Sequence, residues 1–183
     1  LALSPSNIQS GDKILLSGSL GDHGTTILAQ RQHLNLSTEL NSDSQPLHDL
    51  VAEMIKAVPE IRCMRDPTRG GLASILNELS HTCGFAMRLN EMQIPIKDEV
   101  KACTELLGLD PLYIANEGKL VAFCPADKAQ ELLAIMKAHP KGKDAAIIGE
   151  VLSDKRAIVE MQTSFGGKRI VDWRYSDPLP RIC

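Results

Sequence analysis

Short apolar segments alternate with amphipathic segments along most of this 183-residue chain, and this alternation constrains the fold more than any other feature. Residues 13–17, Lys-Ile-Leu-Leu-Ser, have the length and the continuous apolarity of a buried strand. From about 71 to 82, by contrast, leucine and isoleucine recur at helical spacing. Strands that alternate with helices predict an α/β domain in which helices cover a sheet.

The same two patterns predict the remaining elements. Strands are expected at 61–65, 86–89, 119–124, 145–152 and 157–160, with a short one at 169–171. Helices are expected at 25–31, 98–107, and from Pro46 and Pro125 onward. Because the last strands follow one another without helices between them, the sheet is predicted to be mixed. The fold class is therefore α/β (α+β), a mixed sheet covered by helices.

Length and charge narrow the class of protein further. The chain fits one ordinary domain better than two. Its net charge of −3 and its pI near 6.0 argue against nucleic acid or an anionic membrane as the main partner. No apolar run approaches the roughly 18 residues of a membrane helix, and no basic and apolar leader is present. We expect a soluble, cytoplasmic protein.

Cysteine and histidine spacing gives no sign of a metal or disulfide framework. Five cysteines occur, an odd number, and no two form a C-x-x-C pair: Cys63, Cys83, Cys103, Cys124 and Cys183. This argues against disulfides and against a zinc site. The histidines at 33, 48, 81 and 139 share no ligand spacing. We predict no metal ligands and expect the four internal cysteines to be small buried hydrophobes.

The two ends of the chain differ from its middle. The first residue is Leu1, and the opening Leu-Ala-Leu-Ser-Pro is typical of a linker that enters a domain. We expect residues 1–10 to be a linker from a preceding domain, residues 11–175 to form the α/β domain, and residues 176–183 to form a flexible tail. A function divided between two domains would be only half visible in this chain.

The last residue is Cys183, at the end of a tail that contains Pro178 and Pro180. Proline fixes φ and removes a backbone donor, so the tail is expected to be extended. A thiol at the tip of such an arm can enter one active site after another, which suits a carrier of a covalently bound group. The alternatives are an accidental terminal cysteine or, with less support, a redox sensor, since no resolving cysteine lies beside it.

A glycine-rich segment, residues 18–24, follows the first expected strand and precedes a helix. This arrangement aims backbone N–H groups at an anion. The segment lacks the Walker ending and the G-x-G-x-x-G spacing, so a phosphate site and a purely structural turn both stay open. His23 within it is either an acid, base or thiol-activating group or an ordinary loop side chain.

A second turn, residues 65–71, combines two guanidinium groups, a carboxylate, a hydroxyl and two adjacent glycines at the start of a helix. The residues concerned are Arg65, Asp66, Thr68, Arg69, Gly70 and Gly71. Helix capping by Asp66 or Thr68 is the simpler alternative. A cap would explain only one of these polar residues. The other polar side chains of the turn favour contact with phosphates or with a metal-bound nucleotide.

A single carboxylate lies at the start of the very apolar strand expected at 119–124. Glu117 is flanked by Asn116 and Gly118. A carboxylate in this place can be partly desolvated, which would raise its pKa toward that of a general base. The alternative is an ordinary turn residue.

Four segments together resemble the HypE family, the carbamoyl dehydratases of nickel–iron hydrogenase maturation: Ser17–Gly24, Met64–Leu72, Asn116–Lys119 and the ending Pro180–Cys183. The similarity runs from the first strand to the last residue, and the Pro-Arg-Ile-Cys ending is its most specific element. More remotely, the chain is similar to the C-terminal domain of the superfamily that includes aminoimidazole ribonucleotide synthetase and selenophosphate synthetase.

The resemblance implies a reaction on the terminal thiol. A carbamoyltransferase, HypF, would load Cys183 with a carbamoyl group, and ATP with Mg²⁺ would drive its dehydration to a thiocyanate. The cyano group would then pass to iron on the HypC–HypD complex. Glu117 would be the base toward the carbamoyl nitrogen. The nucleotide phosphates would be lined by Asp66, Thr68, Arg69, Gly70 and Gly71, with Arg65, His23 and Asn116 as accessory candidates.

The resemblance also implies a missing half. Family members carry a preceding N-terminal domain that supplies most of the ATP and magnesium site and the homodimer contact. We therefore expect the 183-residue chain to fold but to be inactive alone.

Two other classes of function stay open. A synthetase or kinase of the same superfamily would act on a small diffusible molecule, and trimming Cys183 would leave its activity unchanged. A non-catalytic docking domain would use the tail only to hold a partner, and Cys183→Ser would retain binding.

Overall fold

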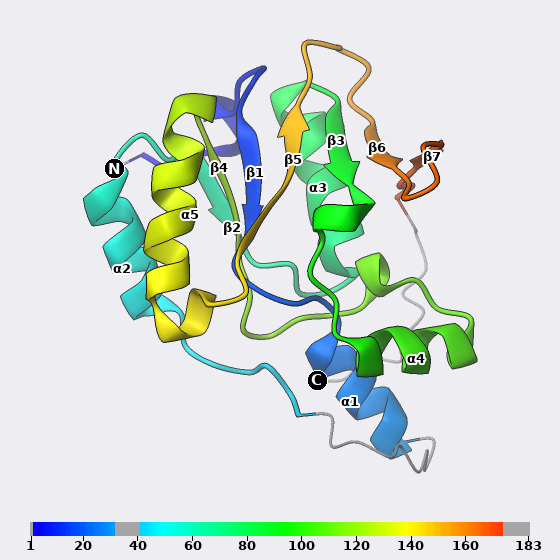
Figure 1. Ribbon diagram of the computed structural model, residues 1–183. Helices are drawn as coiled ribbons and strands as arrows, with labels where there is room; N and C mark the ends of the chain where they lie inside the picture. The colour runs from blue at the N-terminus through cyan, green and yellow to red at the C-terminus, as the bar shows by residue number, and fades with distance from the viewer. Residues whose placement is uncertain (1, 32–40, 174–183) are drawn as a thin grey trace.

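The structure is a computed structural model that describes residues 2–31 and 41–173 (Figure 1). Seven strands of this part of the chain form one sheet in the order β2-β4-β1-β5-β3-β6-β7. Neighbouring strands are antiparallel except for β3 and β6, which are parallel. The prediction of a mixed sheet is thereby confirmed. The strands are β1 (Lys13–Leu16), β2 (Cys63–Arg65), β3 (Met87–Asn90), β4 (Val121–Cys124), β5 (Ala146–Val151), β6 (Val159–Gln162) and β7 (Lys168–Ile170).

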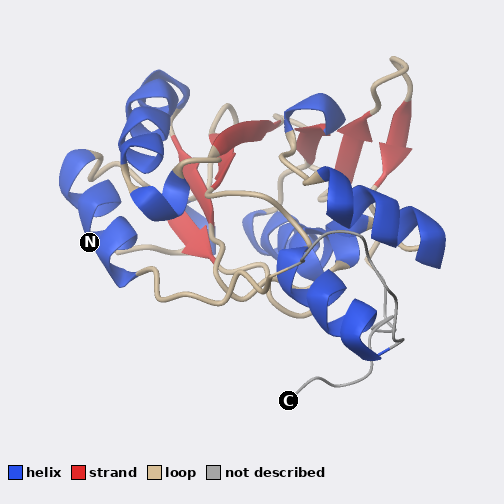
Figure 2. Ribbon diagram, turned by 60° about the horizontal axis from the view of Figure 1, so that its bottom comes forward, coloured by secondary structure: helices blue, strands red, loops and turns tan. Residues whose placement is uncertain are grey.

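Helices cover the sheet on both faces (Figure 2). In the described residues the α-helices are α1 (Asp22–Arg31), α2 (His48–Ala57), α3 (Gly71–Cys83), α4 (Asp98–Leu107) and α5 (Ala129–Ala138). Figure 1 shows α2 and α5 side by side on one face and α3 on the other, while α1 and α4 lie beyond the end of the sheet toward which β1 runs. Short 3-10 helices occur at Pro5–Asn7, Glu91–Gln93, Pro111–Tyr113, Ala126–Lys128 and Pro140–Gly142.

Strand β1 shows why the sheet is covered on both faces. Side chains alternate between the two faces of a strand. Ile14 and Leu16 belong to the core that includes α3, whereas Leu15 belongs to the core beneath α2 and α5. All three are fully buried, and each such burial stabilises the fold by about 1.5–3 kcal/mol. The continuous apolar run in the sequence thus reflects a strand between two layers.

Three helices begin at positions other than those expected. Helix α1 begins at Asp22, not at residue 25, because Gly21 adopts φ +83° and completes the turn earlier. Helix α2 begins at His48, not at Pro46, with Leu47 as its non-helical N-cap. Asp43 and Gln45, just before Pro46, bond to Glu117 and Gly118, and the chain is not yet helical there. Helix α5 begins at Ala129, four residues after Pro125, and the 3-10 helix Ala126–Lys128 lies between them. The other helices and the strands lie within two residues of their expected bounds.

The first residues of the described chain pack against the domain. Ile8 is 2% exposed and belongs to the same core as α3. The Ser4 amide donates a hydrogen bond to the carbonyl of Arg62 at 3.0 Å. The division into a linker, a domain and a tail remains a prediction, and the tail from residue 176 lies outside the described residues. No helix of the described part is long and apolar enough to cross a membrane.

Candidate functional site

The sheet topology brings the three predicted motifs to one end of the sheet. Strands β1 and β2 both run antiparallel to β4, and Leu16 and Arg65, their last residues, both pair with Val121, the first residue of β4. The segment after β1 is the glycine-rich segment 17–24, and the segment after β2 is the turn 66–71. Residues 116–120 lead into β4. Three motifs that are far apart in the sequence therefore meet.

Asn116 connects these three motifs through its buried side chain, which is 1% exposed. Its Oδ1 accepts a hydrogen bond from the amide of Gly21 at 2.8 Å. Its Nδ2 donates to the carbonyls of Pro67 and Ile114, each at 3.0 Å. One carboxamide thus satisfies one donor and two acceptors that would otherwise be buried without partners.

The turn after β2 requires its two glycines. Gly70 and Gly71 both adopt positive φ, +70° and +63°. A Cβ at Gly71 would lie 2.5 Å from the carbonyl oxygen of Leu112 and 2.6 Å from that of Ile114. The adjacent glycines therefore let α3 begin directly against the segment that carries Asn116.

The simpler alternative for this turn, capping by Asp66 or Thr68, is wrong. Gly70 is the N-cap of α3, and α3 has no side-chain cap hydrogen bond. Asp66 and Arg69 are exposed, and Thr68 is half-buried. Arg65 donates to Glu78 on α3 at 3.0 Å, which gives this guanidinium a contact within the domain. Within residues 2–31 and 41–173, no side chain caps the start of α3, as an anion-binding helix terminus requires.

A cleft of about 260 Å³ opens at the same end of the sheet. Buried charges form its wall: Lys119 Nζ lies 2.9 Å from Asp43 Oδ2 and 3.8 Å from Asp22 Oδ2. Lys97 Nζ lies 3.0 Å from the same oxygen of Asp22, which also accepts a 2.7 Å bond from Ser19 Oγ. The side chains of Lys119, Asp43 and Asp22 are only 8%, 2% and 2% exposed. The cleft lining includes neither Glu117 nor the turn 66–71.

Residues 41–45, which we call the strap, lie across the turn 116–119. The Glu117 amide donates to Asp43 Oδ1 at 3.2 Å, and Gln45 Nε2 donates to the carbonyl of Gly118 at 3.2 Å. A Cβ at Gly118 would collide with the carbonyl oxygen of Asp43. The strap and the turn are therefore in close backbone contact, which only a glycine at 118 permits.

Two candidates for acid–base chemistry lie beside the strap. His23 is in the first turn of α1, not in a loop, and its Nδ1 is 2.8 Å from Ser42 Oγ. Glu117 is exposed, so the partial desolvation expected for its carboxylate is not provided by the described residues. The reason is that the strap covers Gly118 and Lys119 but leaves the Glu117 side chain outside. Cys183, with Pro178, Pro180 and Arg181, lies outside the described residues.

The internal cysteines are weak nucleophiles. Cys63, Cys103 and Cys124 are buried, as predicted, and Cys83 is partly buried; all four are free. Burial raises the pKa of the Cys63 thiol to about 11 and that of Cys124 to about 12. It also raises the pKa values of Cys83 and Cys103. These thiols stay protonated near neutral pH.

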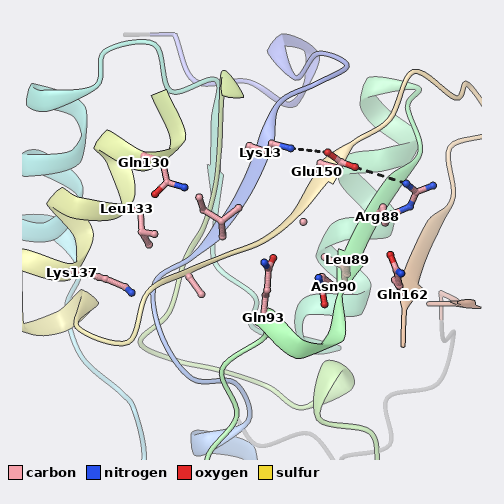
Figure 3. A pocket seen from close by; sticks show the side chains of 13 residues that line it. Lys13, Arg88, Leu89, Asn90, Gln93, Gln130, Leu133, Lys137, Glu150 and Gln162 are labelled. Carbon is pink, nitrogen blue, oxygen red and sulfur yellow. Dashed lines mark hydrogen bonds and ion pairs between the residues drawn. The ribbon is translucent and has the colours of Figure 1, made fainter. Parts of the chain in front are cut away.

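A larger hollow of about 570 Å³ lies elsewhere, between helix α5 and the neighbouring face of the sheet at β1, β5 and β3. Figure 3 shows Glu150 between Lys13 and Arg88, and the closest pair, Lys13 Nζ and Glu150 Oε2, is 2.7 Å apart. Arg88 also bonds Glu160 at 2.6 Å. These charges satisfy one another, and the lining contains no residue of the three motifs. The candidate site is therefore the end of the sheet where the motifs meet.

Sequence reasoning missed the charged residues of the cleft. Asp22 and Lys119 lie inside the predicted motif segments 17–24 and 116–119. Their partners Lys97 and Asp43 belong to no motif and could not be recognised from the sequence. Asp43 belongs to a polar stretch that the sequence indicates only as a loop. Its contacts to Glu117 and Lys119 join residues 74 and 76 positions apart.

The fold and the site define a class: a mixed sheet whose strand ends carry two glycine-rich turns, as in the C-terminal domain of proteins related to aminoimidazole ribonucleotide (AIR) synthase. The family described as "AIR synthase related protein, C-terminal domain" matches residues 9–162, and the chain belongs to it. Thiamine-monophosphate kinase of Stenotrophomonas maltophilia shares the fold, with a TM-score of 0.64 at 20% identity over 89% of this chain and 53% of that one.

Within that family the similarity is to one particular protein. Carbamoyl dehydratase HypE of Azotobacter vinelandii is 57% identical over 183 residues, 100% of this chain and 54% of that protein. The structure of the hydrogenase maturation protein HypE in complex with ATP has a TM-score of 0.91 at 40% identity, over 97% of this chain and 55% of that one. HypE in the structure of a HypE–HypF complex has a TM-score of 0.88 at 41% identity, over 93% of this chain and 55% of that one. The chain thus spans about half the length of the relatives it matches.

Proposed function

We propose that this chain is the C-terminal half of a carbamoyl dehydratase that makes the cyanide ligand of nickel–iron hydrogenases. The observation that carries the proposal is 57% identity to a carbamoyl dehydratase along the whole of the chain. The meeting of three predicted motifs at one end of the sheet supports it. Because the chain spans about half of that relative, the activity belongs to the complete protein, and this half alone is expected to be inactive.

The proposed reaction dehydrates a carbamoyl group on the Cys183 sulfur. The carbamoyl oxygen attacks the γ-phosphorus of ATP, ADP leaves, and the nitrogen loses one proton. The carbon–oxygen bond then breaks, inorganic phosphate leaves, and loss of the second proton gives the thiocyanate. The sum is a thiocarbamate and ATP converted into a thiocyanate, ADP and phosphate. Phosphorylation is needed because it turns a poor leaving oxygen into a good one.

The residues divide between carrier, base and phosphate contacts. Cys183 is the carrier, and the exposed carboxylate of Glu117 takes the proton from the carbamoyl nitrogen. The uncapped start of α3 offers N–H groups to the nucleotide phosphates. Asn116 and Arg65 support this arrangement through bonds within the domain, and His23 does so through Ser42. The phosphate-lining residues are Asp66, Thr68, Arg69, Gly70 and Gly71.

ATP as the nucleotide is supported by the related HypE that was solved with ATP. Magnesium is the expected counter-ion. Among the described residues, no group of three or more histidine, cysteine, aspartate or glutamate side chains could hold a metal ion. The ligands of the metal would come from the other half of the protein and from the ATP phosphates.

A carbamoyltransferase of the HypF type is the proposed donor of the carbamoyl group, and the HypE–HypF complex supports this partner. A HypC–HypD complex as cyanide acceptor and a homodimer formed by the other half complete the proposal. The proposed place of reaction is the cytoplasm.

Intact mass measurement of the full-length protein tests the reaction. After incubation with the carbamoyltransferase, carbamoyl phosphate and ATP, Cys183 should gain about 43 Da, falling to about 25 Da as dehydration proceeds, the formula masses of a carbamoyl and a cyano group on a covalent carrier. Peptide mapping identifies the residue, and Cys183→Ser is the control. An unmodified Cys183 where a known family member is modified would contradict the proposal.

A further inference from the structure

We infer that Asp43 is a positioning residue that holds Glu117 at the place from which it takes the proton. The inference rests on the proposed function, in which Glu117 is the proton acceptor. Asp43 is distant from Glu117 in the sequence, and the polar stretch around it predicts nothing beyond a loop. Its role follows from the contacts between the strap and the turn 116–119.

Both carboxylate oxygens of Asp43 contact the turn 116–119. Oδ1 accepts the amide hydrogen of Glu117 at 3.2 Å, and Oδ2 pairs with Lys119 Nζ at 2.9 Å. The Asp43 side chain is 2% exposed and that of Lys119 is 8% exposed, so their ion pair is largely shielded from water, whereas the bond to the Glu117 amide lies at the surface. The turn is held between them at Gly118, against which the Asp43 carbonyl packs and to which Gln45 donates. Three consecutive residues, 117 to 119, are thus held by one segment.

The Glu117 side chain depends on this backbone support. Within the described residues, its carboxylate makes no hydrogen bond or ion pair, so its direction is set by the main chain that carries it. That main chain is anchored on one side by the Asn116 carboxamide and on the other by Asp43. Loss of the Asp43 side chain removes the acceptor of the Glu117 amide, so that on this side only the contacts of the strap to Gly118 remain.

The charge of Asp43 acts on the same turn through Lys119. Lys119 is 8% exposed, and its other carboxylate neighbour, Asp22, is 3.8 Å away and also pairs with Lys97. Without the negative charge at 43, Lys119 would shift toward Asp22 or toward water, and it would move the end of the turn with it. Removal of partners that orient a reacting group slows reactions by about 10- to 100-fold.

The test measures dehydration separately from carbamoylation in the full-length protein. Wild type, Asp43→Ala and Asp43→Asn are carbamoylated by the HypF-type transferase, and conversion of the adduct to the lighter cyano adduct is then timed by mass after ATP is added. We expect normal carbamoylation of all three. At saturating ATP, conversion should slow about 100-fold in Asp43→Ala and about 10-fold in Asp43→Asn, which keeps an acceptor for the Glu117 amide. The KM for ATP should stay unchanged.

Asp12 provides a matched control. Its side chain is 3% exposed, close to the 2% of Asp43, and it accepts one backbone amide, from Gln9 at 2.8 Å, and one basic side chain, from Arg62 at 2.9 Å. It precedes β1 and therefore lies at the opposite end of the sheet. Asp12→Asn should convert the adduct at the wild-type rate. If it is as slow as Asp43→Asn, the effect at Asp43 is general destabilisation and the inference is overturned.

A double variant distinguishes positioning from local damage. In Glu117→Asp the base is already displaced, so adding Asp43→Ala should slow conversion by only a few-fold, much less than in the wild type. An equal slowing in both backgrounds would overturn the inference, as would a wild-type rate in Asp43→Ala. If Asp43→Ala does not fold, Asp43→Asn is used in its place. Failure of the wild type itself to form the cyano adduct would instead contradict the proposed function.

Discussion

Replacing Asn116 by alanine should separate the three motifs of the site and destabilise the domain. The side chain accepts from the Gly21 amide and donates to the carbonyls of Pro67 and Ile114, at 2.8, 3.0 and 3.0 Å. Each buried hydrogen bond contributes about 1 kcal/mol net. The loss of three therefore predicts a fall in the free energy of unfolding of about 3 kcal/mol, which corresponds to a Tm lower by about 6–12 °C for a chain of this length.

Urea denaturation and thermal melting of the chain measure this loss. Asn77→Ala is a control, because Asn77 is also buried but donates only two hydrogen bonds, to the carbonyls of Ala73 and Val171, both at 2.9 Å. It should cost about 2 kcal/mol and leave the site intact. Asn116→Asp is nearly isosteric but turns an oxygen toward the two carbonyls, so it should be at least as destabilising as alanine. A loss below about 1 kcal/mol for Asn116→Ala, or a stable Asn116→Asp, would refute the reasoning.

Two further predictions concern the turn after β2 and the acid stability of the domain. Gly71→Ala forces a Cβ against two carbonyls at φ +63° and should lower the free energy of unfolding by more than about 2 kcal/mol. Gly84 also has a positive φ, +74°, but open space around it, so Gly84→Ala should cost only about 1 kcal/mol. Equal melting temperatures for the two variants would contradict this. The hydrogen bond from Lys141 lowers the pKa of Asp49 from 3.8 to about 2. The lowered pKa means that Asp49 stabilises the fold above about pH 4 and that this contribution is lost as the pH falls through about 2. The stability difference between wild type and Asp49→Asn, from urea melts across this range, should therefore vanish toward pH 2, and a constant difference would exclude the linkage.

Several parts of the fold and the site were predictable because their causes are local. The run at 13–17 is a strand between two apolar layers, and a continuous apolar stretch of strand length indicates that directly. The leucines of α3 repeat at helical spacing for the same reason. The adjacent glycines at 70 and 71 marked a turn that ordinary residues would strain. The start of α1 was misplaced because the turn at Gly21 is held by a hydrogen bond that the Gly21 amide donates to the Asn116 side chain, 95 residues away.

The sequence by itself determined the alternation of strands and helices, the mixed sheet, and the motif segments that resemble one family. Each of these follows from the order of residues or elements that are close together in the chain. Only the tertiary structure decided that these segments meet at one end of the sheet, that the start of α3 has no side-chain cap, and that Glu117 stays exposed. It also decided that Asp43 lies against Glu117 and Lys119. Such contacts depend on strand register and on the path of the chain across the sheet end, which are set by the packing of the whole domain rather than by any local pattern.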